Sequence, residues 1–135
     1  MVVFHGTDQI SANKILNEKI DVTKGGGELG RGFYVGENVS LVASRAKGKN
    51  QNDFAVIEFN VDNSEYIRLN IKNIGRRELV YKQWQSFFKR NITRTFLSGF
   101  DVICAPYATF DFSNQFKFES KAGEDVINNA DKKEI

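Results

Sequence analysis

The order of apolar and polar positions predicts short strands alternating with short helices in the first half of the chain. An apolar run at residues 2–5 is typical of a strand, and Gly6 and Thr7 are expected to end it. Asp8 or Ser11 can then cap a helix whose apolar face is Ala12, Ile15, Leu16 and Ile20. Residues 32–35 predict the next strand. A second helix follows, with its apolar face at Val39, Val42, Ala43 and Ala46.

Apolar residues at every second position mark the next segment. Residues 53–61 are predicted to form a strand because every second side chain is apolar: Ala55, Ile57, Phe59 and Val61. The polar cluster at residues 62–64 predicts a turn, and residues 65–69 are expected to return as another strand. A longer helix is predicted over residues 77–90, on a face formed by Val80, Trp84, Phe87 and Phe88.

The last third predicts two more strands and a short helix. Residues 101–105 form an apolar run that Pro106 ends, and residues 115–119 are typical of the final strand. A short helix is expected around residues 125–129. Short strands mixed with helices, without a regular βαβ period, indicate an α+β fold in which strands pair antiparallel.

The length of 135 residues corresponds to one domain, because a chain of this size can bury a sizeable core. No second composition regime interrupts it. We therefore expect a single domain over residues 1–130 and a frayed C-terminal tail over residues 131–135.

Composition excludes several classes of protein. The single cysteine, Cys104, cannot form an internal disulfide, which is compatible with a reducing cytosol. The sequence has neither a signal-peptide pattern nor a long apolar run, so we expect a cytoplasmic protein with no membrane partner. One histidine and one cysteine do not make a metal-ligand cluster, and no Ser-His-Asp arrangement is arguable.

A glycine-rich loop carries the first candidate chemistry. Gly25-x-Gly27-x-x-Gly30 matches the dinucleotide fingerprint, which works only when it follows a strand and opens a helix. Here the loop follows a predicted helix and feeds a predicted strand. The context excludes a Rossmann site, and the glycines alone indicate a mobile surface loop.

Three motifs in order carry a more specific signal. They are His5-Gly6-Thr7 after the first strand, Gly30-x-Gly32-Phe33-Tyr34-Val35, and Asn114-Gln115-Phe116 at the start of the last strand. Together they resemble the ADP-ribosyltransferase superfamily, in its diphtheria-toxin-like and poly(ADP-ribose)-polymerase-like branch. The chain is also similar to a family of small uncharacterised bacterial proteins of that superfamily, through residues 84–91, residues 100–103 and Asn114-Gln115-x-x-Phe118-x-Ser120. The resemblance implies split antiparallel β-sheets with flanking helices.

The resemblance also implies roles for individual residues, with NAD+ as co-substrate. His5 would hydrogen-bond the adenosine ribose, and the backbone of Gly6 would grip the nicotinamide carboxamide, where a Cβ would be in the way. Tyr34 would stack on the nicotinamide ring. The remaining matched positions are expected to contact the cofactor: Thr7, Gly32, Phe33 and Ser40.

The third motif departs from the family pattern. Many of these transferases have a glutamate where this chain has Gln115, and its carboxylate binds the nicotinamide ribose and stabilises a cationic transition state. Glutamine keeps the hydrogen-bonding reach without the charge. Glu119 is a reserve, although four residues along a strand span about 13 Å. The catalytic set we expect is His5, Tyr34 and Gln115, with mono-ADP-ribosyl transfer rather than chain elongation.

The sequence gives less information about the acceptor of the ADP-ribosyl group. A basic segment is interleaved with aromatic residues, which is compatible with a nucleic-acid acceptor or with a core helix that has a charged outer face. Its members are Arg68, Lys72, Arg76, Arg77, Lys82, Lys89, Arg90 and Arg94, with Tyr66, Tyr81 and Trp84.

The resulting hypothesis is a pentosyl-transferring glycosyltransferase that modifies a protein or a nucleic acid. By analogy with the superfamily, it would be the toxin of a bacterial or phage toxin–antitoxin or defence system, held by an antitoxin protein. Two alternatives remain open: a non-catalytic NAD+ or ADP-ribose binding module, and a basic nucleic-acid-binding domain.

Overall fold

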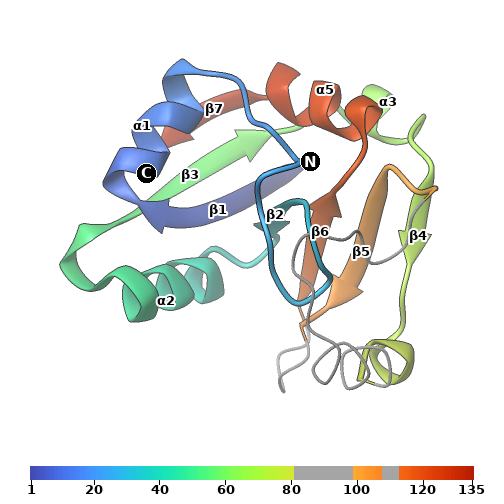
Figure 1. Cartoon of the computed structure of the whole chain (residues 1–135), viewed down its shortest axis with the longest axis horizontal. Helices are drawn as coiled ribbons and strands as arrows, with labels where there is room; N and C mark the ends of the chain where they lie inside the picture. The colour runs from blue at the N-terminus through green and yellow to red at the C-terminus, as the bar shows by residue number, and fades with distance from the viewer. Residues whose placement is uncertain (81–98, 108–112) are drawn as a thin grey trace.

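The fold is built around one twisted sheet. The computed structural model describes residues 1–80, 99–107 and 113–135 (Figure 1). Its strands are β1 (Val2–Asp8), β2 (Phe33–Gly36), β3 (Phe54–Asn60), β4 (Ile71–Asn73), β5 (Val102–Pro106), β6 (Asn114–Phe118) and β7 (Asp131–Glu134). Their order in the sheet is β4-β5-β6-β2-β1-β3-β7, and within these ranges only the β4–β5 pair is parallel. The predicted α+β class with antiparallel pairing is therefore confirmed.

Polar side chains at the N-termini set where the helices begin. The helices are α1 (Gln9–Asn17), α2 (Val39–Asn50), α3 (Asn63–Tyr66) and α5 (Lys121–Asn129), and a 3₁₀ turn, η1 (Gln51–Asp53), follows α2. Asp8 accepts a hydrogen bond from Ser11 N, and Asn38 accepts one from Leu41 N. These side chains satisfy backbone donors that have no partner inside the helix. Of the two predicted caps for the first helix, Asp8 is the one observed.

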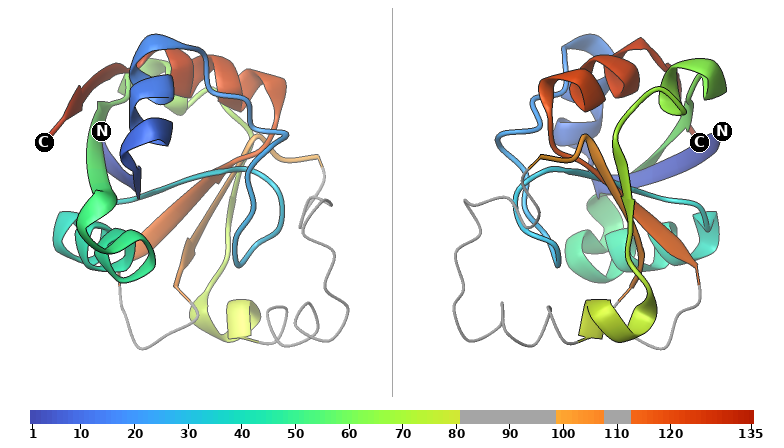
Figure 2. Two further views of the ribbon diagram at one scale, coloured as in Figure 1. Left: turned by 60° about the vertical axis from the view of Figure 1, so that its left-hand side comes forward. Right: turned by 90° about the vertical axis from the view of Figure 1, so that its right-hand side faces the viewer.

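The two faces of the sheet support different elements, because side chains alternate along each strand. Helices α1 and α5 lie together on one side and α2 lies on the other (Figure 2). Phe116 and Phe118 of β6 belong to the main core, which includes residues of α1 and α5. Gln115 and Lys117 alternate with them and therefore face the other side. A smaller apolar cluster lies there, formed by Leu29, Ile74, Leu79, Ile103 and Ala105.

The sheet is weakly joined at its middle. β1 pairs with β3 along its whole length, from Val2 to Asp8. Among the described residues, the ladder between β1 and β2 consists of the Phe4–Gly36 pair alone. The backbones of β1 and β2 therefore leave ladder positions unused beside Phe4, and a side chain can enter there.

Two sequence predictions in this region are wrong. The first strand does not end at Gly6, because β3 continues to pair with it up to Asp8. Residues 65–69 do not form a strand either. The Asp62 carboxylate accepts hydrogen bonds from Ser64 N and Glu65 N and starts the short helix α3, so the next strand is β4, which begins at Ile71.

The end of the chain is also more ordered than expected. In place of a frayed tail, β7 pairs with β3 as an edge strand of the sheet. Lys132 Nζ donates to the carbonyls of Asn128 and Ala130 and ties this strand to the end of α5.

Most of the helix predicted over residues 77–90 falls outside the described residues, although residues 76–80 are helical. None of the helices within the described ranges has the length and apolar character needed to span a bilayer.

Candidate functional site

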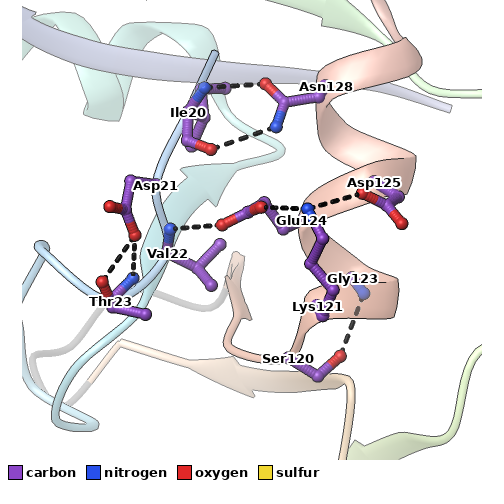
Figure 3. A network of polar contacts seen from close by, with 10 residues as sticks. All are labelled: Ile20, Asp21, Val22, Thr23, Ser120, Lys121, Gly123, Glu124, Asp125 and Asn128. Carbon is purple, nitrogen blue, oxygen red and sulfur yellow. Dashed lines mark hydrogen bonds and ion pairs between the residues drawn. The ribbon is translucent and has the colours of Figure 1, made fainter.

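A polar network holds the start of the glycine-rich loop against α5 (Figure 3). Asn128 Oδ1 accepts from Ile20 N at 2.7 Å, and its Nδ2 donates to Ile20 O at 3.0 Å. Two residues along, Glu124 Oε2 accepts from Val22 N at 3.1 Å. These contacts replace the helix that the sequence predicted through Ile20, because α1 ends at Asn17. The start of the loop is therefore fixed to α5.

A tight turn forms the far part of this loop. Gly30 N donates to Gly27 O at 3.1 Å, which closes the turn around Glu28 and Leu29. The Tyr34 hydroxyl accepts from Leu29 N at 2.9 Å and donates to Gly30 O at 2.6 Å. A Cβ at Gly27 would lie 2.8 Å from the Tyr34 ring, so only glycine allows the turn to lie on this ring.

A pocket of about 280 Å³ opens beside this turn. It is lined by residues from segments that are distant in the sequence: His5, Gly6 and Thr7 of β1, Tyr34 of β2 and Gln115 of β6. The remaining lining residues are Phe4, Asp8, Gly26, Val35, Gly36, Val42, Arg45, Ala46, Lys49, Asn50 and Tyr107. The expected catalytic residues thus meet at one concave site.

His5 occupies the gap between β1 and β2. Its Nδ1 lies 2.6 Å from the carbonyl oxygen of Tyr34, and its ring stacks on Phe33 with centroids 4.3 Å apart. Because a carbonyl only accepts, Nδ1 carries the proton and donates it. Burial lowers the pKa of His5, the bond to Tyr34 raises it, and the positive charge of Lys49 lowers it further. The net direction is down, so the imidazole is neutral at pH 7 and its Nε2 is an acceptor for a hydroxyl group.

The glycine at position 6 has a packing reason of its own. A Cβ there would lie 2.7 Å from the Ala46 side chain and 2.9 Å from Val42 O, both in α2. The missing side chain therefore lets α2 approach β1 closely. This approach brings Arg45 and Lys49, one helical turn apart on α2, to the pocket wall.

Burial shapes the chemistry of Tyr34. It raises the pKa of the phenol, the hydrogen bond from Leu29 opposes this, and the nearby carboxylates of Glu28 and Glu119 raise it further. The net direction is up, so the hydroxyl stays protonated and remains a donor to the turn. The side chain that was expected to stack on a ligand is also the support of the glycine-rich turn.

Gln115 is buried, with 3% of its surface exposed. Its Nε2 donates to Glu28 Oε2 at 2.9 Å and faces Pro106 O at 3.5 Å. The other carboxylate oxygen of Glu28 lies 3.8 Å from a guanidinium nitrogen of Arg45. Arg45 in turn lies over the Tyr107 ring, 4.4 Å from its centroid. A carboxylate from the glycine-rich turn therefore contacts the Gln115 amide.

Several expected site residues lie elsewhere. Phe33 is part of the main core, and Gly32 and Ser40 do not line the pocket. Glu119, the reserve carboxylate, forms a buried ion pair with Lys117, whose Nζ also donates to Leu29 O at 2.7 Å. Burial raises the pKa of Glu119 and lowers that of Lys117, while the pairing opposes both shifts. Glu119 therefore has a structural partner under the loop.

Sequence reasoning missed three polar residues of the site region: Glu28, Arg45 and Lys49. The i, i+4 spacing of Arg45 and Lys49 on a predicted helix was an available signal. Glu28 had none, because its partner Gln115 is 87 residues away in the sequence.

The basic segment is only partly described. Tyr66 packs edge-on against Phe116 and tilted against Phe118, so its half-buried ring lies against the main core. Arg76 donates to Tyr107 O at 3.2 Å. Arg68 and Arg77 are exposed and Lys72 is half-buried, and the candidates at positions 81, 82, 84, 89, 90 and 94 lie outside the described residues. Within the described ranges, no three His, Cys, Asp or Glu side chains gather where they could hold a metal ion.

Comparison with known proteins adds no assignment: no protein-family model matches the chain, and no curated protein matches it either.

Proposed function

We propose that this protein is an NAD+-dependent mono-ADP-ribosyltransferase with an ADP-ribosyltransferase-like fold. The observation that carries the proposal is the convergence of His5, Tyr34 and Gln115 on one pocket. These residues belong to the three short motifs that resemble the superfamily. The seven strands of the described residues form one sheet and not the split sheets that the resemblance implies. The single-pair ladder between β1 and β2 still supports the proposal, because it lies where such a sheet would divide.

The chemistry of the pocket suits a dinucleotide. The Nε2 atom of neutral His5 can accept a hydrogen bond from a ribose hydroxyl. Arg45 and Lys49 supply positive charge for a pyrophosphate. The volume of about 280 Å³ lies near the lower end of ligand pockets. It suits the nicotinamide and its ribose, with the rest of the dinucleotide lying along the basic wall.

The proposed reaction breaks the bond between ribose C1′ and the nicotinamide nitrogen. The electron pair leaves with nicotinamide and neutralises its positive ring. An oxygen or nitrogen atom of the acceptor, or of water in simple hydrolysis, bonds to C1′ and releases its proton to solvent. Positive charge builds up on the ribose during this step, so a nearby negative or acceptor group stabilises the transition state.

A cytoplasmic toxin held by an antitoxin, acting on protein or nucleic acid, remains the proposed biological setting. One observation favours a second candidate, a non-catalytic binder of NAD+ or ADP-ribose. Position 115 has an amide and no carboxylate of its own. Nicotinamide release distinguishes the two candidates, because only the enzyme breaks the glycosidic bond.

Calorimetric titration with NAD+ tests the pocket itself. We expect the full chain to bind NAD+ and His5→Ala to weaken binding by about 1–3 kcal/mol, the cost of leaving a ligand hydroxyl without its partner. Ser40→Ala is the matched control, because Ser40 is exposed and does not line the pocket, and its affinity should equal that of wild type. Absence of NAD+ binding by the wild type, or equal affinity in folded His5→Ala, would refute this site.

A further inference from the structure

The glycine-rich turn fixes the place of the Glu28 side chain. Its flanking residue Leu29 is fully buried, and both backbone groups of Leu29 are bonded, N–H to the Tyr34 hydroxyl and C=O to Lys117 Nζ. The Gly30–Gly27 hydrogen bond closes the turn. Glu28 therefore projects from a backbone that is held at several points. Because the loop is already ordered, little conformational entropy is lost when the carboxylate binds Gln115.

The contact with Glu28 decides which way the Gln115 amide points. An ionised carboxylate only accepts hydrogen bonds, and so does the carbonyl of Pro106. Both lie at the same end of the amide, so that end must be the NH₂ group. The carbonyl oxygen Oε1 is the opposite end, and none of the other described residues donates to it. An amide fixed in this way offers an acceptor to the pocket.

We propose that Glu28 is a positioning residue for the reaction and that Glu28 and Gln115 together do the work of the family's single glutamate. Glu28 locks the amide so that Oε1 accepts from the ribose hydroxyl of NAD+. Its negative charge polarises the amide through the hydrogen bond, which increases the negative character of Oε1. Glu28 does not line the pocket, so it acts through Gln115. This inference rests on the proposed function.

The pair explains why a glutamine is tolerated at position 115. A glutamate there would place two carboxylates at the distance that now separates Nε2 and Oε2, 2.9 Å. Like charges so close cannot both ionise without a large cost, and the hydrogen bond would be replaced by repulsion or by a shared proton. Exchanging the two residues keeps one amide and one carboxylate in contact, with the charge now facing the ribose.

The test is a set of four proteins assayed for nicotinamide release from NAD+. We expect Glu28→Gln to lower kcat by about tenfold or more with little change in KM, because the lost interaction acts in the transition state. We expect Gln115→Glu alone to be similarly impaired. The exchanged double variant, Glu28→Gln with Gln115→Glu, should recover at least half of the wild-type kcat, because the hydrogen bond is restored. Such recovery is not expected of two independent structural lesions.

Glu37→Gln is the matched control. The Glu37 carboxylate also contacts β6, where it accepts from Asn114 N at 2.8 Å, but Glu37 is exposed and does not line the pocket. It should release nicotinamide at the wild-type rate. An active wild type whose Glu28→Gln variant keeps full kcat, or whose exchanged variant is no better than the worse single variant, overturns the role of Glu28 alone. A wild type that releases no nicotinamide refutes the proposed function, and the role of Glu28 falls with it.

Discussion

Replacing Tyr34 with phenylalanine tests whether this side chain supports the glycine-rich turn. The change keeps the aromatic ring and removes a hydroxyl that bonds both Leu29 N and Gly30 O. Each unpaired buried group costs about 1–3 kcal/mol, and partial access of water to this loop reduces the sum to roughly 2 kcal/mol. For a domain of this length, that loss corresponds to a drop in Tm of about 5–10 °C.

The same substitution should also affect catalysis. Loosening the turn releases Glu28 from Gln115, so we expect Tyr34→Phe to lower kcat for nicotinamide release while NAD+ affinity changes less, because the ring remains. Urea unfolding followed by circular dichroism gives the stability, and the release assay gives kcat. A variant within about 0.5 kcal/mol of wild type with full kcat would refute the role given to the hydroxyl.

Two further substitutions test the surroundings of the site. Folding lowers the pKa of His5 from 6.5, so the unfolded chain binds a proton at a higher pH than the folded protein does. The contribution of neutral His5 to the free energy of unfolding is therefore fully present above about pH 6.5 and is lost as the pH falls. Unfolding between pH 7.5 and 5.5 should therefore show a smaller loss of stability in His5→Phe than in wild type; equal losses would contradict the neutral histidine. Asn128→Asp removes the donor to Ile20 O and should cost about 1–3 kcal/mol in urea unfolding. The exposed neighbour variant Asn129→Asp should stay within about 0.5 kcal/mol of wild type, and equal behaviour of the two would contradict the anchoring of the loop.

Local patterns predicted most of the secondary structure because they depend on neighbours in the chain. The alternating apolar residues of segment 53–61 lie in or beside strand β3, and Val39 and Val42, whose spacing predicted a helix, lie in α2. The predictions are wrong where pairing with a strand that is distant in the sequence determines the structure. β1 passes through Gly6 because β3 pairs with it, and residues 131–134 form β7 for the same reason.

The candidate site was likewise predictable only where local motifs specify it. The motifs around His5, Tyr34 and Gln115 were visible in the sequence, and these residues line one pocket. The dual use of the Tyr34 hydroxyl and the contact between Glu28 and Gln115 were not visible, because both depend on the path of a glycine-rich loop. Such a loop has few side chains from which a pattern could be read, and the contacts that fix it come from α5, β2 and β6.

Nicotinamide release by the wild-type chain tests the central claim most directly. The protein is incubated with NAD+, and free nicotinamide is quantified by chromatography beside Gln115→Ala, which removes the acceptor oxygen from the pocket. We expect time-dependent release by the wild type and a rate at least about tenfold lower for Gln115→Ala, equivalent to about 1.4 kcal/mol of transition-state stabilisation. Release by neither protein, or equal release by both, would contradict the assignment of this pocket as an ADP-ribosyltransferase site.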